Sequence, residues 1–568
     1  SFRGMERFSK TLLFSAWVMV PRVIGTLISY EVERRTIGKT GTGEANEKHE
    51  RKYFTAEDKR HPVPQLRYSR AGRDKNSRLR NMSNFCLLYP SLTLAGIVDP
   101  VVNIRDGLSL KQLKDKTAKS LQREINKANL KQFSTDGGDA ERWYWAAPLL
   151  LDKLNKSGQA PLDEWFGGNG PKQEPWGRPT YFRGAATNAS AKEQHFAHLR
   201  ECYDAPETAG LGSLPKNLSK VLAELALGSP AVLTLRSLRR MFPDEQGDAS
   251  SMVGAFDAAD EFVNLFNKPE SIAAVRLGTS HKSYWQMVAR YCANGCLQSV
   301  LDEYFHVLQG QNVDAEAAIQ QLIGSVNLDT ASISVDGLDT FLNRKPKQKM
   351  RCHYAVEFGS QRIETDEGGK RAANLREVFN SPFRPFVLAT TSIGQEGLDF
   401  HSYCRRIVHW NLPGNPIDLE QREGRINRYK GLVIRQVVAS KYRDMLVDYS
   451  GDVWEKLFDL ADKHERRAKG KCELVPYWHV ETDDIKIERV IPFYPYSSDQ
   501  AKLSKILKTL AVYRLAFGQP RQAELVEHLL GHDFDEVEMK QILDSLMIDL
   551  SPINYQTPTE AFRHHSGG

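Results

Sequence analysis

Residues 386–431 constrain the fold of this chain more than any other stretch. They open with an apolar run, Phe386 to Ala389, which is typical of a buried strand. A second apolar run, Ile407 to Trp410, ends at Pro413-Gly414-Asn415-Pro416, which breaks the chain before a predicted helix. Short strands alternating with helices predict a parallel sheet, and ligands bind such sheets at the C-terminal edge of the strands.

The helix predicted after this break carries three arginines, Arg422, Arg425 and Arg428. Arg425 and Arg428 are three positions apart, so their side chains leave the same helical face. Two guanidinium groups with forked donors suit a polyphosphate better than a single carboxylate. This spacing therefore indicates a site for a strongly anionic ligand.

Three segments resemble motifs of superfamily-two helicases and translocases. Residues 391–399, Thr-Ser-Ile-Gly-Gln-Glu-Gly-Leu-Asp, resemble motif V, and residues 421–428, Gln-Arg-Glu-Gly-Arg-Ile-Asn-Arg, resemble motif VI. The two occur in the family's order and are most similar to the Snf2-like branch, although Gly424 stands where that branch often has Asp. Leu13-Phe14-Ser15-x-Trp17, which ends an earlier apolar run, resembles motif IV, the start of the second of two RecA-like lobes.

This resemblance implies ATP hydrolysis in a cleft between two RecA-like lobes, with ATP and Mg²⁺ held mainly by the first lobe and no metal site in this chain. Arginine fingers neutralise the charge that develops during phosphoryl transfer. By motif match, Arg425 and Arg428 are the candidate fingers. The match also assigns nucleotide contacts to Gly397, Asp399, Gln421 and Arg422, and nucleic-acid backbone contacts to Ser15, Thr391 and Ser392. Backbone contacts fix position without reading base sequence.

The features of a first RecA-like lobe are not found in the sequence. It holds no valid Walker A loop and no Asp-Glu-x-His or Asp-Glu-x-Asp box. Gly38-Lys39-Thr40 superficially resembles a phosphate loop, but it follows a predicted helix and Glu33 stands in place of the first glycine. We therefore expect this chain, which opens at Ser1 without Met, to be cut from a longer protein, inactive alone, and completed by a first lobe in the same or another chain.

The predicted fold is an α/β RecA-like lobe with a parallel sheet, interrupted by a large, mainly helical insertion and followed by a helical C-terminal region. The expected segments are 1–43 (motif IV), 44–350 (insertion), 351–450 (motifs V and VI) and 451–568 (C-terminal region). Val433 to Val438 is expected to form a further strand, and Ser283 to Leu308 a single helix.

Three features of the insertion leave alternatives open. The basic run from Arg67 to Arg80 suits nucleic-acid phosphates or a solvated loop. The aromatic residues of the segment 165–184 suit base stacking, although core packing or a partner contact is the stronger expectation. Cys292 and Cys296 are spaced as ligands on one helical face, but no second pair accompanies them, which favours ordinary core thiols over a metal site.

Composition narrows the function classes further. The 568 residues are 41% hydrophobic and 26% charged, as in soluble globular proteins, and the net charge of +6 is compatible with a polyanionic partner. Seven cysteines, an odd and scattered set, are typical of reduced thiols in a cytoplasm. No run is long and apolar enough to span a membrane.

The expected function is that of the C-terminal part of an ATP-dependent nucleic-acid helicase or translocase, with DNA favoured over RNA. Residues 380–391, Asn-Ser-Pro-Phe-Arg-Pro-Phe-Val-Leu-Ala-Thr-Thr, resemble helicases of bacterial anti-phage defence systems, which implies further defence-complex subunits as partners. The alternative is a non-catalytic scaffold or interaction subunit that keeps a helicase-like lobe.

Overall fold

The chain divides into two compact units, described separately here. In this computed structural model the described residues are 8–37, 64–71, 78–102, 107–167, 186–243, 247–276, 283–327, 332–335, 348–358, 374–391, 398–446, 451–482, 484–515, 521–532 and 535–546. The sheet unit comprises residues 4–30, 330–445 and 456–568. The helical unit comprises residues 1–3, 31–329 and 446–455.

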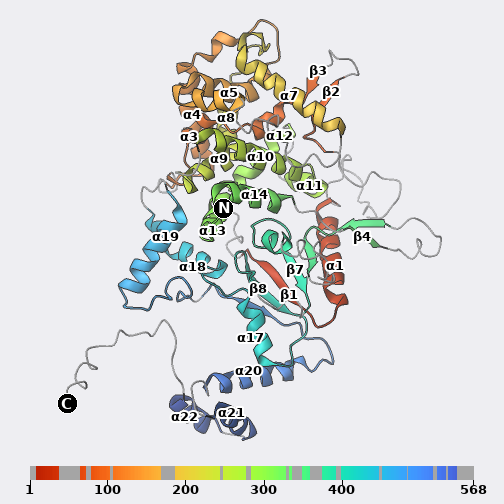
Figure 1. Ribbon diagram of the computed structural model, residues 1–568, viewed down its shortest axis with the longest axis vertical. Helices are drawn as coiled ribbons and strands as arrows, with labels where there is room; N and C mark the ends of the chain where they lie inside the picture. Colours follow the sequence, from red (N-terminus) through yellow and green to blue (C-terminus); the bar gives the residue numbers. More distant parts are fainter. Residues whose placement is uncertain are drawn as a thin grey trace, which may run out of the picture. The chain divides into compact units, whose positions relative to one another are not determined.

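The sheet unit is built on a five-stranded sheet (Figure 1). Its strands, in spatial order, are β6 (Ala355–Phe358), β7 (Val387–Thr390), β1 (Lys10–Phe14), β8 (Cys404–His409) and β9 (Glu488–Val490). Every neighbouring pair is parallel, and Phe14 is in register with both Thr390 and His409. The α/β parallel-sheet prediction is confirmed.

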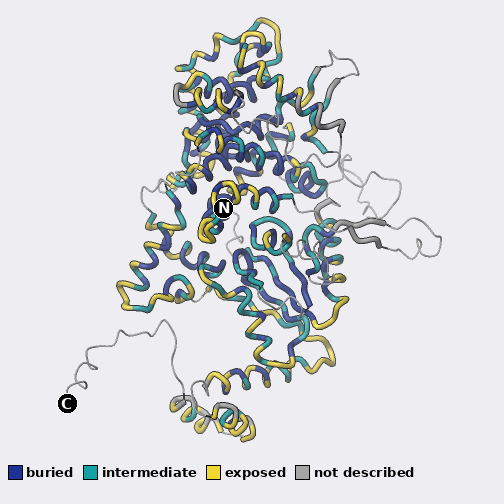
Figure 2. The backbone as a smooth tube through the Cα atoms, in the orientation of Figure 1, coloured by how far each residue is buried: buried dark blue, intermediate teal, exposed yellow. Residues whose placement is uncertain are grey.

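Strand β1 lies at the centre of this sheet although hundreds of residues separate it from β7 and β8 in the sequence. Leu12 and Phe14 on β1 are fully buried and pack in one core with Leu388 and Ile407. Figure 2 shows these central strands as largely buried. Helix α1 (Met19–Ile37) follows β1, as the sequence predicted.

The segment after motif VI is a helix and not a strand, so that prediction was wrong. Helix α18 (Leu432–Tyr442) buries its apolar residues together with Arg435, whose guanidinium donates to the carbonyl of Lys430 at 2.8 Å. β-branched residues favour strands only weakly, and tertiary packing overrides that preference here. The sheet position next to β8 is filled instead by β9, from a later segment.

The C-terminal region of the sheet unit is mainly helical. It contains α19 (Val453–Ala461), the π-helix η8 (Asp462–Arg467), α20 (Asp499–Leu515), α21 (Gln522–Gly531) and α22 (Glu536–Leu546). Helix α20 packs on α17 (Pro416–Gly424), with Leu412 and Leu419 buried against Ile506 and Leu510. A separate antiparallel pair, β4 (Ser332–Val335) and β5 (Gln348–Arg351), also belongs to this unit.

The helical unit packs around α8, α9 and α10, which Figure 2 shows largely buried. Its helices are α2 (Phe85–Leu88), α3 (Leu92–Ile97), α4 (Leu110–Lys127), α5 (Trp143–Leu154), α6 (Lys156–Gly167), α7 (Ala186–Asp204), α8 (Leu218–Gly228), α9 (Pro230–Met241), α10 (Asp248–Phe266), α11 (Pro269–Arg276), α12 (Tyr284–Asn294), α13 (Leu297–Gln309) and α14 (Ala315–Val326). One antiparallel hairpin, β2 (Ser69–Ala71) and β3 (Arg78–Arg80), accompanies them. The predicted helical character of the insertion is confirmed.

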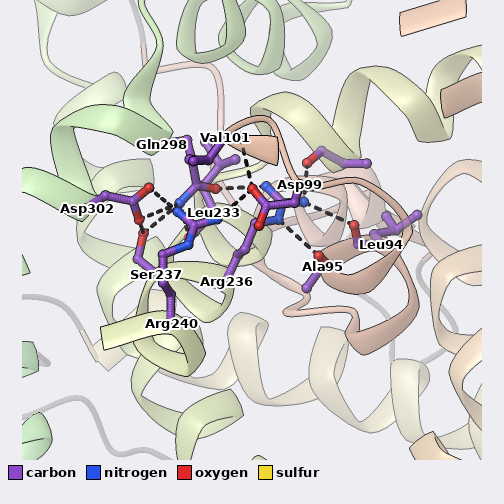
Figure 3. Close-up of polar contacts among 11 residues, drawn as sticks. Leu94, Ala95, Asp99, Val101, Leu233, Arg236, Ser237, Arg240, Gln298 and Asp302 are labelled. Carbon is purple, nitrogen blue, oxygen red and sulfur yellow. Dashed lines mark hydrogen bonds and ion pairs between the residues drawn. The ribbon is translucent and has the colours of Figure 1, made fainter. Parts of the chain in front are cut away.

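A buried polar network ties helices of this unit together (Figure 3). Arg236 on α9 donates to the carbonyls of Leu94, Ala95 and Ala226 at 2.8 to 3.1 Å, and to the Gln298 side chain at 2.7 Å. The carbonyls of Leu94 and Ala95 lie in α3 and that of Ala226 in the last turn of α8, so this one guanidinium satisfies acceptors that helix ends leave open. Burial lowers the pKa of Arg236 to about 10, so the side chain stays charged at neutral pH.

The two cysteines considered as ligands differ in position and exposure. The predicted single helix breaks into α12 and α13 at Cys296, whose φ of 54° is left-handed. Cys292 is buried and Cys296 exposed, so the two thiols lie in different surroundings. Within the described residues, no group of three or more His, Cys, Asp or Glu side chains could hold a metal ion.

The first two aromatic residues of segment 165–184 pack in the core. This agrees with the expectation that favoured core packing over base stacking. Trp165 and Phe166 are buried at the end of α6, where both rings contact Phe196. Trp176, Tyr181 and Phe182 lie outside the described residues, as do Gly38-Lys39-Thr40 and positions 72–77 of the basic run.

None of the described helices is by itself long and apolar enough to cross a bilayer. Helices α8 and α9, which meet at an angle of 54°, reach that length and apolar composition only when taken together.

Candidate functional site

The candidate site lies where the central strands end. Because β7, β1 and β8 are parallel and in register, the residues that follow them, Thr391, Ser15 and Trp410-Asn411, come to one edge of the sheet. This is the edge at which parallel α/β sheets bind ligands. The structure thus brings Ser15 of motif IV close to Thr391 of motif V, although the two are far apart in the sequence.

Ser15 is fully buried, and its hydroxyl is engaged within the lobe. Its Oγ lies 3.2 Å from Asn411 Oδ1 and accepts the Trp17 backbone N–H at 3.0 Å. Asn411 Oδ1 also accepts the Ala16 N–H at 2.8 Å. In this structure Ser15 therefore orders the loop after β1. Any contact of that loop with a phosphate would come from its neighbours.

Thr391 is differently placed. Its side chain is 5% exposed, and its hydroxyl has no hydrogen-bond partner among the described residues. A buried hydroxyl without a partner costs free energy, of order 1 to 3 kcal/mol. A ligand oxygen at the strand end would supply the missing bond, so Thr391 remains a candidate contact.

Helix α17 starts where the sequence breaks the chain. The Asn415 side chain accepts the Ile417 N–H at 3.0 Å, and Pro416 occupies the first helical position. Leu419 is fully buried and anchors the helix to the unit. The helix ends at Gly424, so Arg422 lies in its last turn, Arg425 is the C-cap and Arg428 lies beyond the helix. The expectation that Arg425 and Arg428 leave the same helical face was therefore wrong.

Arg422 is the buried arginine of the three. It is 4% exposed, its Nη1 donates to the Asn411 carbonyl at 3.3 Å, and its guanidinium carbon lies 5.2 Å from the Phe14 ring centroid. Burial lowers the pKa of this guanidinium, an effect that Asp418 partly opposes. Arg422 thus connects α17 to the ends of β1 and β8.

Arg425 and Arg428 are half-buried and adjoin the end of motif V. Arg425 donates from Nη1 to the Leu398 carbonyl at 3.4 Å, and its own carbonyl accepts the Phe400 N–H at 2.9 Å. Arg428 Nε donates to Asp399 Oδ1 at 2.8 Å. These side chains are 37% exposed for Arg428 and 46% for Asp399, so the ion pair is open to solvent.

Glu423, between the arginines, has its own set of partners. Arg489 holds it through two hydrogen bonds, and His409 Nε2 lies 3.4 Å from its Oε1. Burial alone would raise the pKa of Glu423, but the hydrogen bonds from His409 and Arg489 outweigh it and lower the pKa to about 2. The carboxylate is therefore ionised at neutral pH and occupied by these two partners, so it does not neutralise Arg425 or Arg428 by a direct ion pair.

The remaining predicted residues are less defined. Gln421 is exposed on α17, whereas Ser392 and Gly397 lie outside the described residues. One residue that the motifs do not contain shapes the site: Asn411, whose side chain contacts Ser15 and accepts the Ala16 N–H. The sequence signal for it was an asparagine directly after an apolar run.

The arrangement can bind an anion beside the segment that leads into β8, where Leu398 and Asp399 lie. Arg425 and Arg428 offer guanidinium groups within reach of solvent, and Asp399, which pairs with Arg428, is itself half-exposed. An exposed ion pair contributes little free energy, about 0 to 1 kcal/mol, so a polyphosphate could displace the carboxylate. No metal-binding cluster accompanies these groups in the described part of the chain.

Comparison with known proteins agrees with this geometry. Residues 340–430 match the family described as the helicase conserved C-terminal domain, a range that includes β7, β8 and α17 with the predicted motifs V and VI. Neither the search of curated proteins nor that of solved structures found a match. Over this range the chain is similar to the C-terminal lobe of helicases of superfamilies 1 and 2.

Proposed function

We propose that this chain is the C-terminal part of an ATP-driven helicase or translocase that acts on nucleic acid, with Arg425 as its principal arginine finger. The observation that carries the proposal is the position of Arg425 and Arg428. Both adjoin Leu398 and Asp399, at the end of the predicted motif V. In this proposal a first RecA-like lobe, from the same or another chain, holds ATP and Mg²⁺.

The two arginines would act in different ways. Arg425 donates from Nη1 to the Leu398 carbonyl through a long hydrogen bond of 3.4 Å, which a phosphate would replace. Arg428 would exchange Asp399 for a phosphate when nucleotide arrives, and Asp399, once released, would accept from a ribose hydroxyl or an ordered water. Such an exchange makes the lobe respond to the presence of the triphosphate. Phosphoryl transfer depends on positioning and charge neutralisation, which these groups supply.

The test is DNA-stimulated ATP hydrolysis by this chain combined with the first lobe. Arg425→Ala is expected to lower the stimulated rate by about 10³-fold, because arginine fingers contribute on the order of 10³ to 10⁵ in rate. Arg443→Ala is the matched control, since that side chain is 68% exposed in the same unit and contacts only its neighbour Asp444 in the described structure. Equal hydrolysis by the Arg425 variant and the wild type would overturn the finger assignment.

A second candidate function is a non-catalytic scaffold or interaction subunit. One observation favours it: Arg428 already has a carboxylate partner in its own lobe. A scaffold would show no DNA-stimulated hydrolysis in the wild type, with or without a first lobe. Our preference for the motor rests on the position of Arg425, which adjoins the end of the predicted motif V at Leu398.

We infer DNA in preference to RNA, and a role in anti-phage defence, only from the resemblance of residues 380–391 and of the motifs. Competition between DNA and RNA of one sequence for the combined protein tests the first inference. Protection of bacteria from phage by the wild type but not by Arg425→Ala tests the second, and also asks whether defence requires hydrolysis.

A further inference from the structure

Three aromatic rings stack in a column that runs from the core of the sheet unit to its surface. The buried Phe458 stacks on Tyr477, with ring centroids 5.9 Å apart and planes at 17°. Tyr477 stacks in turn on Tyr429, at 5.6 Å and 25°. Offset parallel stacking at such separations is favourable between aromatic rings. The first ring is inaccessible and the last is 48% exposed, so the ring column ends in solvent.

Trp478 and Lys430 flank the ring column. Trp478 is 42% exposed, and its ring is 6.2 Å from that of Tyr429 with planes at 62°, so it stands as a wall beside the outermost ring. The Lys430 ammonium lies 4.6 to 5.7 Å from the centroids of all three stacked rings. The Lys430 N–H donates to the Tyr477 carbonyl at 2.8 Å, which fixes the segment after Arg428 against residue 477.

The ring column lies beside a basic segment. Residues 462–471 hold five lysines and arginines against two acidic residues. Burial and Asp462 raise the pKa of Tyr477, and Arg466 lowers it, so both charged residues of this segment lie near the ring. Arg466 and Arg467 pair with Asp462, and Lys469 pairs with Glu465, which leaves the segment a net positive charge. Lys463 is exposed in η8. Exposed aromatic rings beside excess positive charge are the combination with which proteins bind single-stranded nucleic acid.

We propose that the ring column formed by Phe458, Tyr477 and Tyr429 is a stacking site for one base of a single-stranded nucleic acid, with Trp478 at its side and the basic segment 462–471 on the phosphates. The base would add a fourth ring to the exposed end of the column. Stacking does not distinguish between bases, so the site suits a protein that moves along varied sequence. The choice of ligand rests on the proposed function, and the site itself rests on these contacts.

The test measures binding of fluorescein-labelled oligothymidine to the 568-residue chain by fluorescence anisotropy, without nucleotide. Tyr429→Ala is expected to weaken binding about tenfold, since one base stack contributes about that much. Tyr429→Phe keeps the ring and should bind like the wild type. Phe493→Ala is the matched control because that ring is 50% exposed in the same unit.

Two further measurements separate stacking from a structural effect. On an abasic strand of equal length, Tyr429→Ala and the wild type should bind equally, because no base is present to stack. Lys463→Ala should reduce the slope of log affinity against log salt by about 1, whereas Tyr429→Ala should leave the slope unchanged.

Three results would overturn the proposal. They are a wild type that does not bind the oligonucleotide, a Tyr429→Ala variant that loses the same affinity on the abasic strand, and a Tyr429→Ala variant that binds oligothymidine like the wild type. Because the assay contains no nucleotide, it is independent of the Arg425→Ala test. Loss of the motor assignment would leave the stacking result standing, and the reverse also holds.

Discussion

At the scale of residues, the motifs located the arginines but not their partners. The three-residue spacing of Arg425 and Arg428 predicted one helical face, which was wrong because α17 ends at Gly424. Both side chains nevertheless adjoin one segment, at Leu398 and Asp399. The sequence did not reveal that Asp399 pairs with Arg428, because the pair joins a loop to the residues after a helix. Ion pairs of that kind depend on tertiary placement. The burial of Ser15 could not be predicted for the same reason, because the Asn411 side chain that contacts it belongs to the segment after β8.

Glu261 leads to a prediction about pH. This residue on α10 is 1% exposed, its Oε1 has no hydrogen-bond partner among the described residues, and burial raises its pKa from 4.5 to about 7. A carboxyl whose pKa is higher in the folded state holds its proton more tightly there. It therefore contributes stability that is complete below the unfolded pKa and is lost as the pH rises through 7.

Glu261→Gln, which mimics the protonated form, should therefore be more stable than the wild type at about pH 8, by up to about 3 kcal/mol. The two proteins should be alike near pH 4. Urea unfolding across this range measures the difference, with the exposed Glu141→Gln of the same unit as control. A wild type whose stability rises between pH 5 and 8 relative to the variant would contradict the assignment.

At the scale of elements, apolar runs bounded by polar or breaking residues were predicted well, and segments without such boundaries were not. Residues 10–14 and 386–389 were placed in strands and the structure agrees, because each run is bounded by polar or breaking residues. The apolar pattern of Val433 to Val438 is equally compatible with a strand and with a turn of buried helix. Tertiary packing determines which of the two forms. The break at Cys296 could not be predicted, because its left-handed backbone conformation has little sequence signal at a residue other than glycine or asparagine.

Helix α8 gives a prediction about close packing. A Cβ added at Gly228, the last residue of α8, would lie 1.9 Å from the Ala289 carbonyl oxygen of α12, and backbone cannot yield as a flexible side chain can. Gly228→Ala is therefore expected to destabilise the helical unit by about 3 kcal/mol or more.

Gly324→Ala is the opposite case, because nothing lies within 4 Å of an added Cβ inside α14. It should stabilise the protein by about 0.5 to 1 kcal/mol through the unfolded chain. Urea midpoints followed by circular dichroism compare the two variants. Similar midpoints for both would show that α8 and α12 are not packed as described.

At the scale of the whole chain, each unit draws on segments far apart in the sequence. Residues 446–455 follow the sheet unit but belong to the helical unit. There the Asp452 carboxylate lies 2.5 Å from His306 Nδ1 of α13, and each side chain is 9% exposed. The sequence did not predict that residues 446–455 pack in the helical unit, because nothing in them specifies which distant helix they contact.

Asp452→Ala should leave His306 without its buried partner and loosen this returning segment. We expect amide hydrogen exchange to quicken in residues 451–461 and in α13, with a loss of about 2 to 4 kcal/mol of local stability. Asp444→Ala, whose side chain is 90% exposed, is the control. Unchanged exchange in both variants would show that the pair does not hold the segment.

The central place of β1 also governs the order of events during synthesis. Its two neighbours, β7 and β8, emerge from the ribosome after the whole helical insertion, which at about 5 to 20 residues per second is a delay on the order of half a minute. Throughout that interval the apolar strand Lys10–Phe14 has no described strand to pair with. Nascent chains of this protein are therefore expected to depend on chaperones that shield an early, unpartnered hydrophobic segment.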